Sequence, residues 1–132
     1  MNKIVEELKK VGVFFIATVE EQQPRVRPFS SIAEYEGSAY ICSGIQKEFY
    51  KQVQQNPHIE ISGMYDGGTW IRVSATLKED NRIEVQQAVL SDPTGPSQLY
   101  RPQDGRFITY KLENIKAYKY NFYAMPQEIK EN

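Results

Sequence analysis

Alternating apolar and polar positions recur along most of the chain and predict a fold built mainly of β-strands. The clearest alternation covers residues 69–77, where the two faces of an extended strand differ in polarity. One face would carry Ile71, Val73, Ala75 and Leu77, and the other Trp70, Arg72, Ser74 and Thr76. Runs rich in β-branched and aromatic residues predict further extended segments at 13–19, 25–36, 38–42, 58–65, 106–112 and 115–122.

Helical spacing of apolar residues replaces this alternation in a few short segments. Residues 2–11 form an amphipathic pattern that Gly12 ends, and residues 44–56 change to helical spacing until Asn56-Pro57. Residues 82–90 predict another helix, with Ile83, Gln86, Gln87 and Leu90 on one side.

Glycine, proline and polar clusters separate these elements and predict the connections between them. Hairpin turns are expected at Glu36-Gly37, at Asp66-Gly67-Gly68 and at Glu113-Asn114. Residues 91–105 contain several prolines and glycines and predict a loop, and the polar tail from residue 124 onward is expected to fray. About seven strands joined by short turns favour an antiparallel sheet that is closed or half-closed into a barrel.

The 132 residues suit one domain spanning 1–132. That length leaves no room for a separate cofactor domain, so a cofactor would bind at the domain edge or between subunits. The formal net charge of −1 gives no basic footprint for nucleic acid. No targeting segment or apolar run long enough for a membrane span is visible, so a cytoplasmic protein is expected.

The sequence supplies few residues for unaided catalysis. Cys42 is the only cysteine and His58 the only histidine, which argues against metal clusters and against a Ser-His-Asp triad. Cys42 is expected to be a small buried strand residue and His58 a surface residue. No pair of carboxylates has a spacing that indicates acid–base work, so an enzyme of this sequence would rely on a cofactor.

The segment Arg25-Val26-Arg27-Pro28-Phe29-Ser30 is the first candidate site. Arg25 and Arg27 project from the same face of a strand, and Pro28 cannot donate a sheet hydrogen bond, which predicts an edge. Two guanidinium groups beside a free edge could hold a phosphate and a planar heterocycle. The alternative is a charged outer face that only meets solvent.

The segment from Cys42 to Lys47 is the second candidate, because a strand ends there and a helix begins. Free amides at a helix N-terminus favour an anion, and Ser43 could cap that helix. Lys47 in the first turn is disfavoured by the helix dipole unless an anion binds or Glu48 offsets its charge. Both interpretations of Lys47 remain open.

Trp70 and Arg72 form the third candidate, on the more polar face of their strand. A large aromatic ring and a guanidinium two residues apart could stack on and hydrogen-bond to a ring system. From these residues alone, packing against another strand or against a partner subunit is the favoured interpretation.

The order of these segments resembles the pyridoxamine 5'-phosphate oxidase-like superfamily of FMN-binding proteins. The resemblance rests on the strand FFIATV, then PRVRPFSSIAEYEGSAYICSG, the helix QKEFYKQVQQNP, the strand GGTWIRVSATL and RFITYKLENIKAYKYNF, and covers roughly residues 10–123. Within the superfamily, the chain is most similar to the short nitroimidazole-reductase-like proteins. The fold implied is an antiparallel, Greek-key split β-barrel.

The resemblance also implies a homodimer with FMN at the subunit interface. The cofactor contacts carried over are Arg25, Val26, Arg27, Pro28, Phe29 and Ser30 along the ribityl chain and ring edge. Ser43, Gln46 and Lys47 match the phosphate-binding stretch, with Cys42 beside them and Tyr50 and Lys51 as further contacts. Trp70 and Arg72 match a strand that the other subunit contributes near the flavin ring.

Two departures from the true oxidase narrow the expected activity. The chain has no obvious counterpart of the oxidase's C-terminal Trp and Arg segment, and Lys47-Glu48-Phe49 stands where a Ser-Arg-Lys series is usual. Oxidation of pyridoxamine phosphate is therefore not expected. The leading hypothesis is a flavin-dependent reductase that passes electrons from a nicotinamide to a nitro compound or quinone. The alternatives are a flavin- or ligand-binding module without turnover and a cofactor-free dimer, and haem is disfavoured because only His58 could ligate it.

Overall fold

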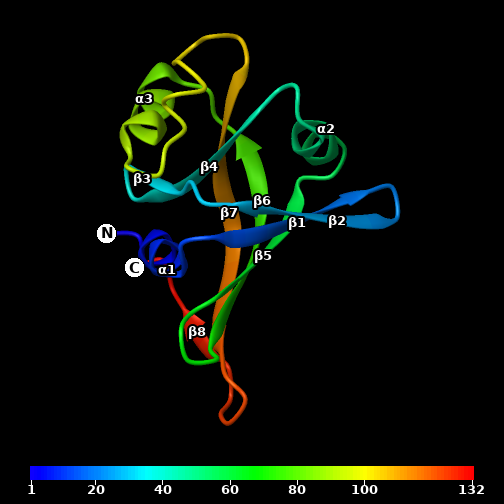
Figure 1. Ribbon diagram of the computed structural model, residues 1–132, viewed down its shortest axis with the longest axis vertical. Helices are drawn as coiled ribbons and strands as arrows, with labels where there is room; N and C mark the ends of the chain where they lie inside the picture. The colour runs from blue at the N-terminus through cyan, green and yellow to red at the C-terminus, as the bar shows by residue number, and fades with distance from the viewer.

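One antiparallel sheet forms the body of the structure, a computed structural model that describes residues 1–132. Its eight strands follow the order β2-β1-β5-β6-β7-β4-β3, with β8 paired to β7. The strands are β1 (Phe14–Glu20), β2 (Gln23–Phe29), β3 (Ala33–Tyr35), β4 (Ser38–Gly44), β5 (His58–Met64), β6 (Trp70–Glu79), β7 (Phe107–Tyr120) and β8 (Gln127–Ile129). The sheet is antiparallel throughout and does not close on itself (Figure 1). This architecture confirms the predicted mainly-β, split-barrel fold.

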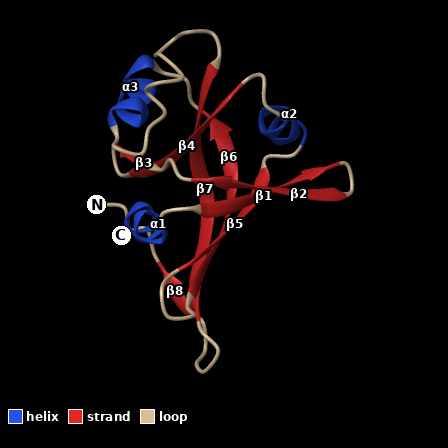
Figure 2. Ribbon diagram, viewed as in Figure 1, coloured by secondary structure: helices blue, strands red, loops and turns tan.

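Three short helices cover parts of the sheet, as Figure 2 shows. The helix α1 (Lys3–Val11) begins where Asn2 Oδ1 accepts hydrogen bonds from the amides of Ile4 and Val5, and it ends at Gly12 with φ +85°. The helix α2 spans Glu48–Gln55 and α3 spans Ile83–Ser91. The predicted helix at 44–56 starts late because Gly44–Lys47 forms a turn, in which the amide of Lys47 donates to the carbonyl of Gly44. No helix in the structure is long and apolar enough to cross a membrane.

The alternation read in β6 separates the core from the opposite side of the sheet. Ile71, Val73, Ala75 and Leu77 are all buried in the main apolar cluster, as predicted. A smaller cluster lies against α3 and contains Val85, Val89, Tyr100 and Phe107. The face of β1, β5 and β6 that points away from the main core is called the outer face below; on β1 it carries Phe15, Ala17 and Val19.

The extended stretch 25–36 is divided between opposite edges of the sheet. β2 ends at Phe29 and β3 starts at Ala33, and these strands lie at the two ends of the strand order. Residues 30–32 therefore cross from one edge to the other. Periodicity reports extended backbone but not which neighbour each half pairs with, so this break was not visible in the sequence.

The final part of the chain differs most from its prediction. The expected turn at Glu113-Asn114 is a β-bulge within the single long strand β7, where Asn114 has φ +53° and the register with β6 shifts between Ser74 and Thr76. Asparagine tolerates that left-handed conformation, so the strand continues through the bulge.

The predicted frayed tail instead contains β8. This strand pairs with β7, and the next residues return to α1: the amide of Lys3 donates to the carbonyl of Glu131, and Asn2 Nδ2 donates to Glu131 Oε2 at 2.8 Å. The prediction of fraying was wrong because these contacts are mainly backbone hydrogen bonds, which a polar composition does not reveal.

The buried face of α3 also differs from its prediction. Val85, Gln86 and Val89 face inward, whereas Ile83 is 49% exposed. The side-chain amide of Gln86 can be buried at low cost, because its Nε2 donates a hydrogen bond to the carbonyl of Phe107. The spacing of residues predicts a face that includes Gln86, but it does not show that the Gln86 side chain supports the backbone of Phe107.

Glu7 fastens α1 to the far end of the sheet. Its carboxylate accepts a hydrogen bond from the Tyr65 hydroxyl at 2.7 Å and pairs with Lys119 at 3.1 Å and Lys10 at 3.0 Å. Burial raises the pKa of Glu7, but these partners outweigh burial and hold the pKa at about 2. The folded state therefore favours the ionised carboxylate.

Stability should fall in acid through Glu7. Because the folded pKa is lowered, the stabilisation is complete above the unfolded value near 4.5 and is lost as the pH falls through about 2. Glu7→Gln should lower the free energy of unfolding at pH 7 by about 2 kcal/mol and by much less near pH 2. Urea unfolding across that range measures it. Glu6→Gln is the control, and an equal loss for both variants at both pH values would contradict the role of Glu7.

Candidate functional site

Polar groups at the end of β4 and at the start of α2 have no hydrogen-bond partner in the chain. Ser43 is 6% exposed and its Oγ makes no hydrogen bond. Lys47 stands at the N-cap of α2, and no side chain caps the helix there. A buried hydroxyl without a partner costs about 1–3 kcal/mol, so its retention points to a group that it binds.

A pocket of about 220 Å³ opens beside this turn, between the ends of β2 and β4. The curl of the sheet brings these ends together although they lie far apart in the strand order. Of the residues that the sequence singled out, the pocket is lined by Arg27, Pro28, Phe29, Ser30, Cys42, Ser43 and Lys47. The candidate segment that contains Arg27 and the candidate segment that contains Ser43 therefore meet in one site.

The pocket also has walls that the sequence did not indicate. They come from Ser31 and Phe49 and from the loop after α3, through Thr94, Pro96, Leu99 and Tyr100. Gln46 supports the loop, because its Nε2 donates to the Tyr100 hydroxyl at 2.9 Å. A Cβ on Gly44 would collide with that hydroxyl and with the Gln46 amide, so a larger residue there would displace both side-chain ends. The proline content of the loop predicted its irregularity but not its place over the pocket.

Arg27 lines the pocket but is also tied into the fold. Its Nη1 donates to the carbonyl of Ile16 at 3.0 Å and to Thr18 Oγ1 at 2.8 Å, and its Nη2 donates to Gln52 Oε1 at 2.5 Å. The guanidinium also lies 5.2 Å from the centre of the Phe49 ring. Burial lowers the pKa of Arg27, yet arginine keeps its proton in proteins. Its charge therefore remains in the pocket wall.

Cys42 lines the pocket as a protonated thiol. Burial raises its pKa, and its Sγ donates a weak hydrogen bond to Ser31 Oγ at 3.6 Å. A thiol held in this form is a small packing group and not a ready nucleophile.

The remaining predicted residues lie outside the pocket. Arg25 pairs with Glu20 at 3.0 Å in solvent, and Val26 is exposed on the other side of β2. Tyr50 accepts a hydrogen bond from Gln54, and Lys51 lies near Glu48 at 3.6 Å, both on α2.

Trp70 and Arg72 lie at the opposite end of the sheet from the pocket. Trp70 stacks on Tyr120 with 5.5 Å between ring centres. Arg72 lies over the same Tyr120 ring and pairs with Glu60 at 3.3 Å. Within one chain, this pair does not reach the pocket.

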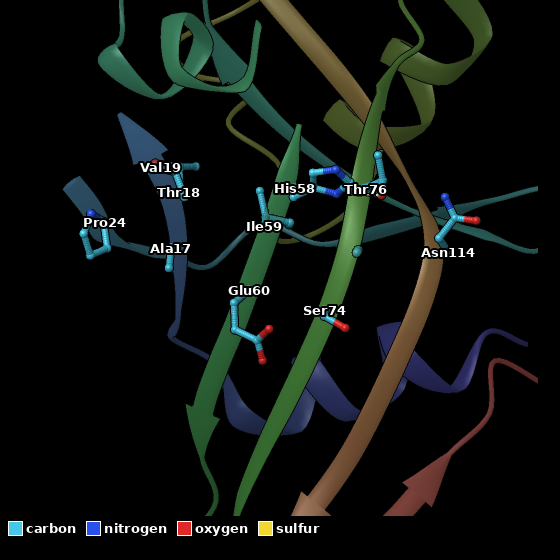
Figure 3. Close-up of a pocket in the computed structure, with 11 residues that line it drawn as sticks. Ala17, Thr18, Val19, Pro24, His58, Ile59, Glu60, Ser74, Thr76 and Asn114 are labelled. Atoms are coloured by element: carbon cyan, nitrogen blue, oxygen red, sulfur yellow. Dashed lines mark hydrogen bonds between the residues drawn. The ribbon is translucent and has the colours of Figure 1, made fainter. Parts of the chain in front are cut away.

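A second hollow of about 350 Å³ lies on the outer face, over β1, β5, β6 and the bulge in β7 (Figure 3). Small side chains, including Ala17, Ser74 and Thr76, line it. His58 lies beside Thr76, with 3.3 Å between Nδ1 and Oγ1. The hollow is shallow and contains no cluster of acids and bases, so it suits contact with another surface better than chemistry.

The model of the pyridoxamine 5'-phosphate oxidase family matches residues 1–115. The chain belongs to this family. The predicted membership is thus confirmed, and the family match covers the whole of the pocket described above. A comparison with curated proteins finds no match.

Among solved structures, a NimC/NimA family protein from Clostridium acetobutylicum is 38% identical, with a TM-score of 0.90 over 96% of this chain and 89% of that one. A pyridoxamine 5'-phosphate oxidase-related, FMN-binding protein from Nostoc punctiforme is 17% identical, with a TM-score of 0.66 over 93% and 81% of the two chains. A haem-binding protein from Mycobacterium smegmatis is 15% identical, with a TM-score of 0.68 over 96% and 57%. The last two similarities show the shared fold alone.

Replacing Arg27 should test its structural role. Arg27→Ala removes the hydrogen bonds that join β2 to β1 and α2, and should lower the free energy of unfolding by about 2–3 kcal/mol. Arg25→Ala removes only an exposed ion pair and should change it by less than about 0.5 kcal/mol. Urea denaturation of both variants measures the difference, and equal effects would argue against Arg27 as an anchor.

Proposed function

We propose that this protein is an FMN-dependent oxidoreductase that works as a homodimer. It would use electrons from a nicotinamide cofactor to reduce a small acceptor such as a nitro compound or quinone. The observation that carries the proposal is the buried, unpartnered hydroxyl of Ser43 at the end of β4, in the same pocket as Arg27 and as Lys47 at the uncapped start of α2.

The turn before α2 suits a phosphate. The free amides of the first helical turn and the Ser43 hydroxyl can donate to phosphate oxygens, and Lys47 supplies a positive charge. A bound phosphate would also offset the unfavourable position of Lys47 at the positive end of the helix. These residues therefore fit the phosphate group of FMN.

The other side of the pocket suits an aromatic ring system. Pro28 and Phe29 offer apolar surface, and Ser30 and Ser31 offer polar groups at the point where the chain leaves the sheet. When bound, FMN supplies the chemistry of accepting a hydride and passing two electrons on. The fixed charge of Arg27 in the pocket wall would stabilise negative charge on the reduced cofactor.

A dimer is part of the proposal because one chain does not complete the site. The pocket of about 220 Å³ is smaller than the roughly 300–1,000 Å³ typical of small-molecule sites. Pro28 lies in register with Phe15, which is 46% exposed on the outer face, so the pocket borders that face. A second copy packed there would close the site and bring Trp70 and Arg72 toward it.

A flavin fits this pocket better than haem does. His58, the only histidine, lies in the hollow on the outer face and does not line the pocket. The pocket therefore offers no imidazole as an axial ligand.

Visible absorption of the purified protein, before and after mixing with FMN and desalting, tests the cofactor. Flavin bands at about one FMN per chain would support the proposal, and steady oxidation of reduced nicotinamide with a quinone would support turnover. Flavin without turnover would favour a binding module. A Soret band, retention of a deazaflavin in place of FMN, or a colourless protein that retains no flavin would overturn the FMN assignment.

Two substitutions test the phosphate site. Ser43→Ala should weaken FMN binding about tenfold yet leave the apoprotein as stable or more stable, because it removes a buried hydroxyl that has no partner. Lys47→Ala should weaken FMN binding by a similar or larger factor, and the affinity should fall further with added salt in the wild type than in this variant. Lys78→Ala, at an exposed lysine of β6, is the control. Fluorescence titration with FMN measures the affinities, and unchanged affinity in both variants would place the phosphate elsewhere.

A further inference from the structure

The far end of the sheet carries a cluster of aromatic residues, two of which are largely exposed. This aromatic tip consists of Trp70, Tyr120, Phe122 and Tyr123. Trp70 lies between Tyr120 and Phe122, with 5.5 and 5.2 Å between ring centres. Phe122 is 75% exposed and Tyr123 is 97% exposed. Large apolar groups gathered at one exposed place generally mark a contact site.

Hydrogen bonds brace the backbone of the turn that carries the tip. Asn121 Oδ1 accepts from the amides of both Tyr123 and Ala124 at 2.8 Å. The chain then returns along the sheet, where Gln127 pairs with Lys119. The aromatic side chains are thus presented on a braced turn and not on a loose tail.

The tip is too far from the pocket to act on it within one chain. β7 begins beside the pocket, where Phe107 pairs with Gly44, and ends at the tip with Tyr120. Its 14 residues span up to roughly 40 Å at the rise of an extended strand. Only another molecule can bring an aromatic tip to this pocket.

A second copy of this chain is the occupant that the geometry favours. The small residues of the hollow on the outer face lie between the pocket end and the tip end of the sheet, where two sheets could approach closely. A two-fold axis through that region would exchange the two ends, so that each tip would meet the partner's undersized pocket. Both contacts form at once, because an isologous interface repeats every pairing.

We propose that Phe122 and Tyr123 of each subunit form the acceptor-facing wall of the partner's flavin site. This inference rests on the proposed function and extends it to the acceptor. No charged residue occurs from Tyr120 to Gln127, so the wall favours a neutral, planar aromatic acceptor. A quinone of this class would take up two electrons and two protons to give the hydroquinone, from the nicotinamide hydride and one solvent proton.

Trp70 has a positioning role in this arrangement. Tyr120 stacks on one side of it and Phe122 packs against it, so the most exposed rings are Phe122 and Tyr123. Trp70 therefore supports the wall that the acceptor meets.

Kinetics of the FMN-loaded dimer test the wall. The double variant Phe122→Ala/Tyr123→Ala should keep one FMN per chain and the rate at which NADH or NADPH reduces the flavin. Its kcat/KM for a naphthoquinone should fall about tenfold, mainly through KM, while turnover of ferricyanide, which needs no stacking, should stay unchanged. Ile83→Ala, an exposed apolar residue on α3, should change neither. Equal losses with both acceptors, or no loss with the quinone, would overturn the proposal.

The single tryptophan provides an independent measurement. A flavin near the partner's tip should quench the fluorescence of Trp70 strongly, and removal of FMN should restore it. A protein that binds one FMN per chain with unquenched Trp70 would overturn this inference and leave the proposed function intact. A protein that binds no FMN would overturn both.

Discussion

The hydrogen bonds of Arg27 determine where the candidate site can form. This side chain starts on β2, reaches the backbone and Thr18 of β1, and holds Gln52 of α2. Phe49 and Val53 of α2 are also buried in the main core, so Arg27 and this packing together place α2 over the end of β4. The position of Ser43 and Lys47 relative to Phe29 follows from this junction. A guanidinium suits the task because it donates in several directions within one plane.

The site combines this stability with groups left unsatisfied. Ser43 is buried without a hydrogen bond, and the helix that follows it begins without a cap. Each feature lowers stability in the free protein and becomes favourable when an anion occupies the turn. Arg27, by contrast, has its partners within the chain. In this pocket, Arg27 holds the surrounding strands and helix together, whereas Ser43 and the start of α2 are free to bind a ligand.

Local periodicity predicted the parts of the fold that repeat a simple pattern. The alternation in β6 identified its buried face, and the glycines at 37, 67 and 68, all with positive φ, marked real hairpins. The pattern failed where pairing over long sequence distances decides the outcome. The bulge at Asn114 resembles a turn in sequence, and β8 is polar but is held by its neighbours.

The same distinction applies to the candidate site. The segments around Arg27 and Ser43 could be found from residue types, since each combines charge with a strand end. Thr94 and Tyr100 could not, because no local feature places their loop over the pocket. The sequence predicts a strand that ends at Phe122 and assigns Tyr123 to no element, and only the folded chain shows that both side chains are largely exposed.

The close fit of Gly44 against the Tyr100 hydroxyl limits which substitutions evolution can accept at these two positions. A side chain at position 44 would collide with that hydroxyl, and also with the Gln46 amide that binds it. A larger residue at position 44 therefore requires these side-chain ends to move, which disturbs their hydrogen bond, or a smaller residue at position 100. Among relatives that keep this loop, positions 44 and 100 should vary together, although they are 56 positions apart in the chain.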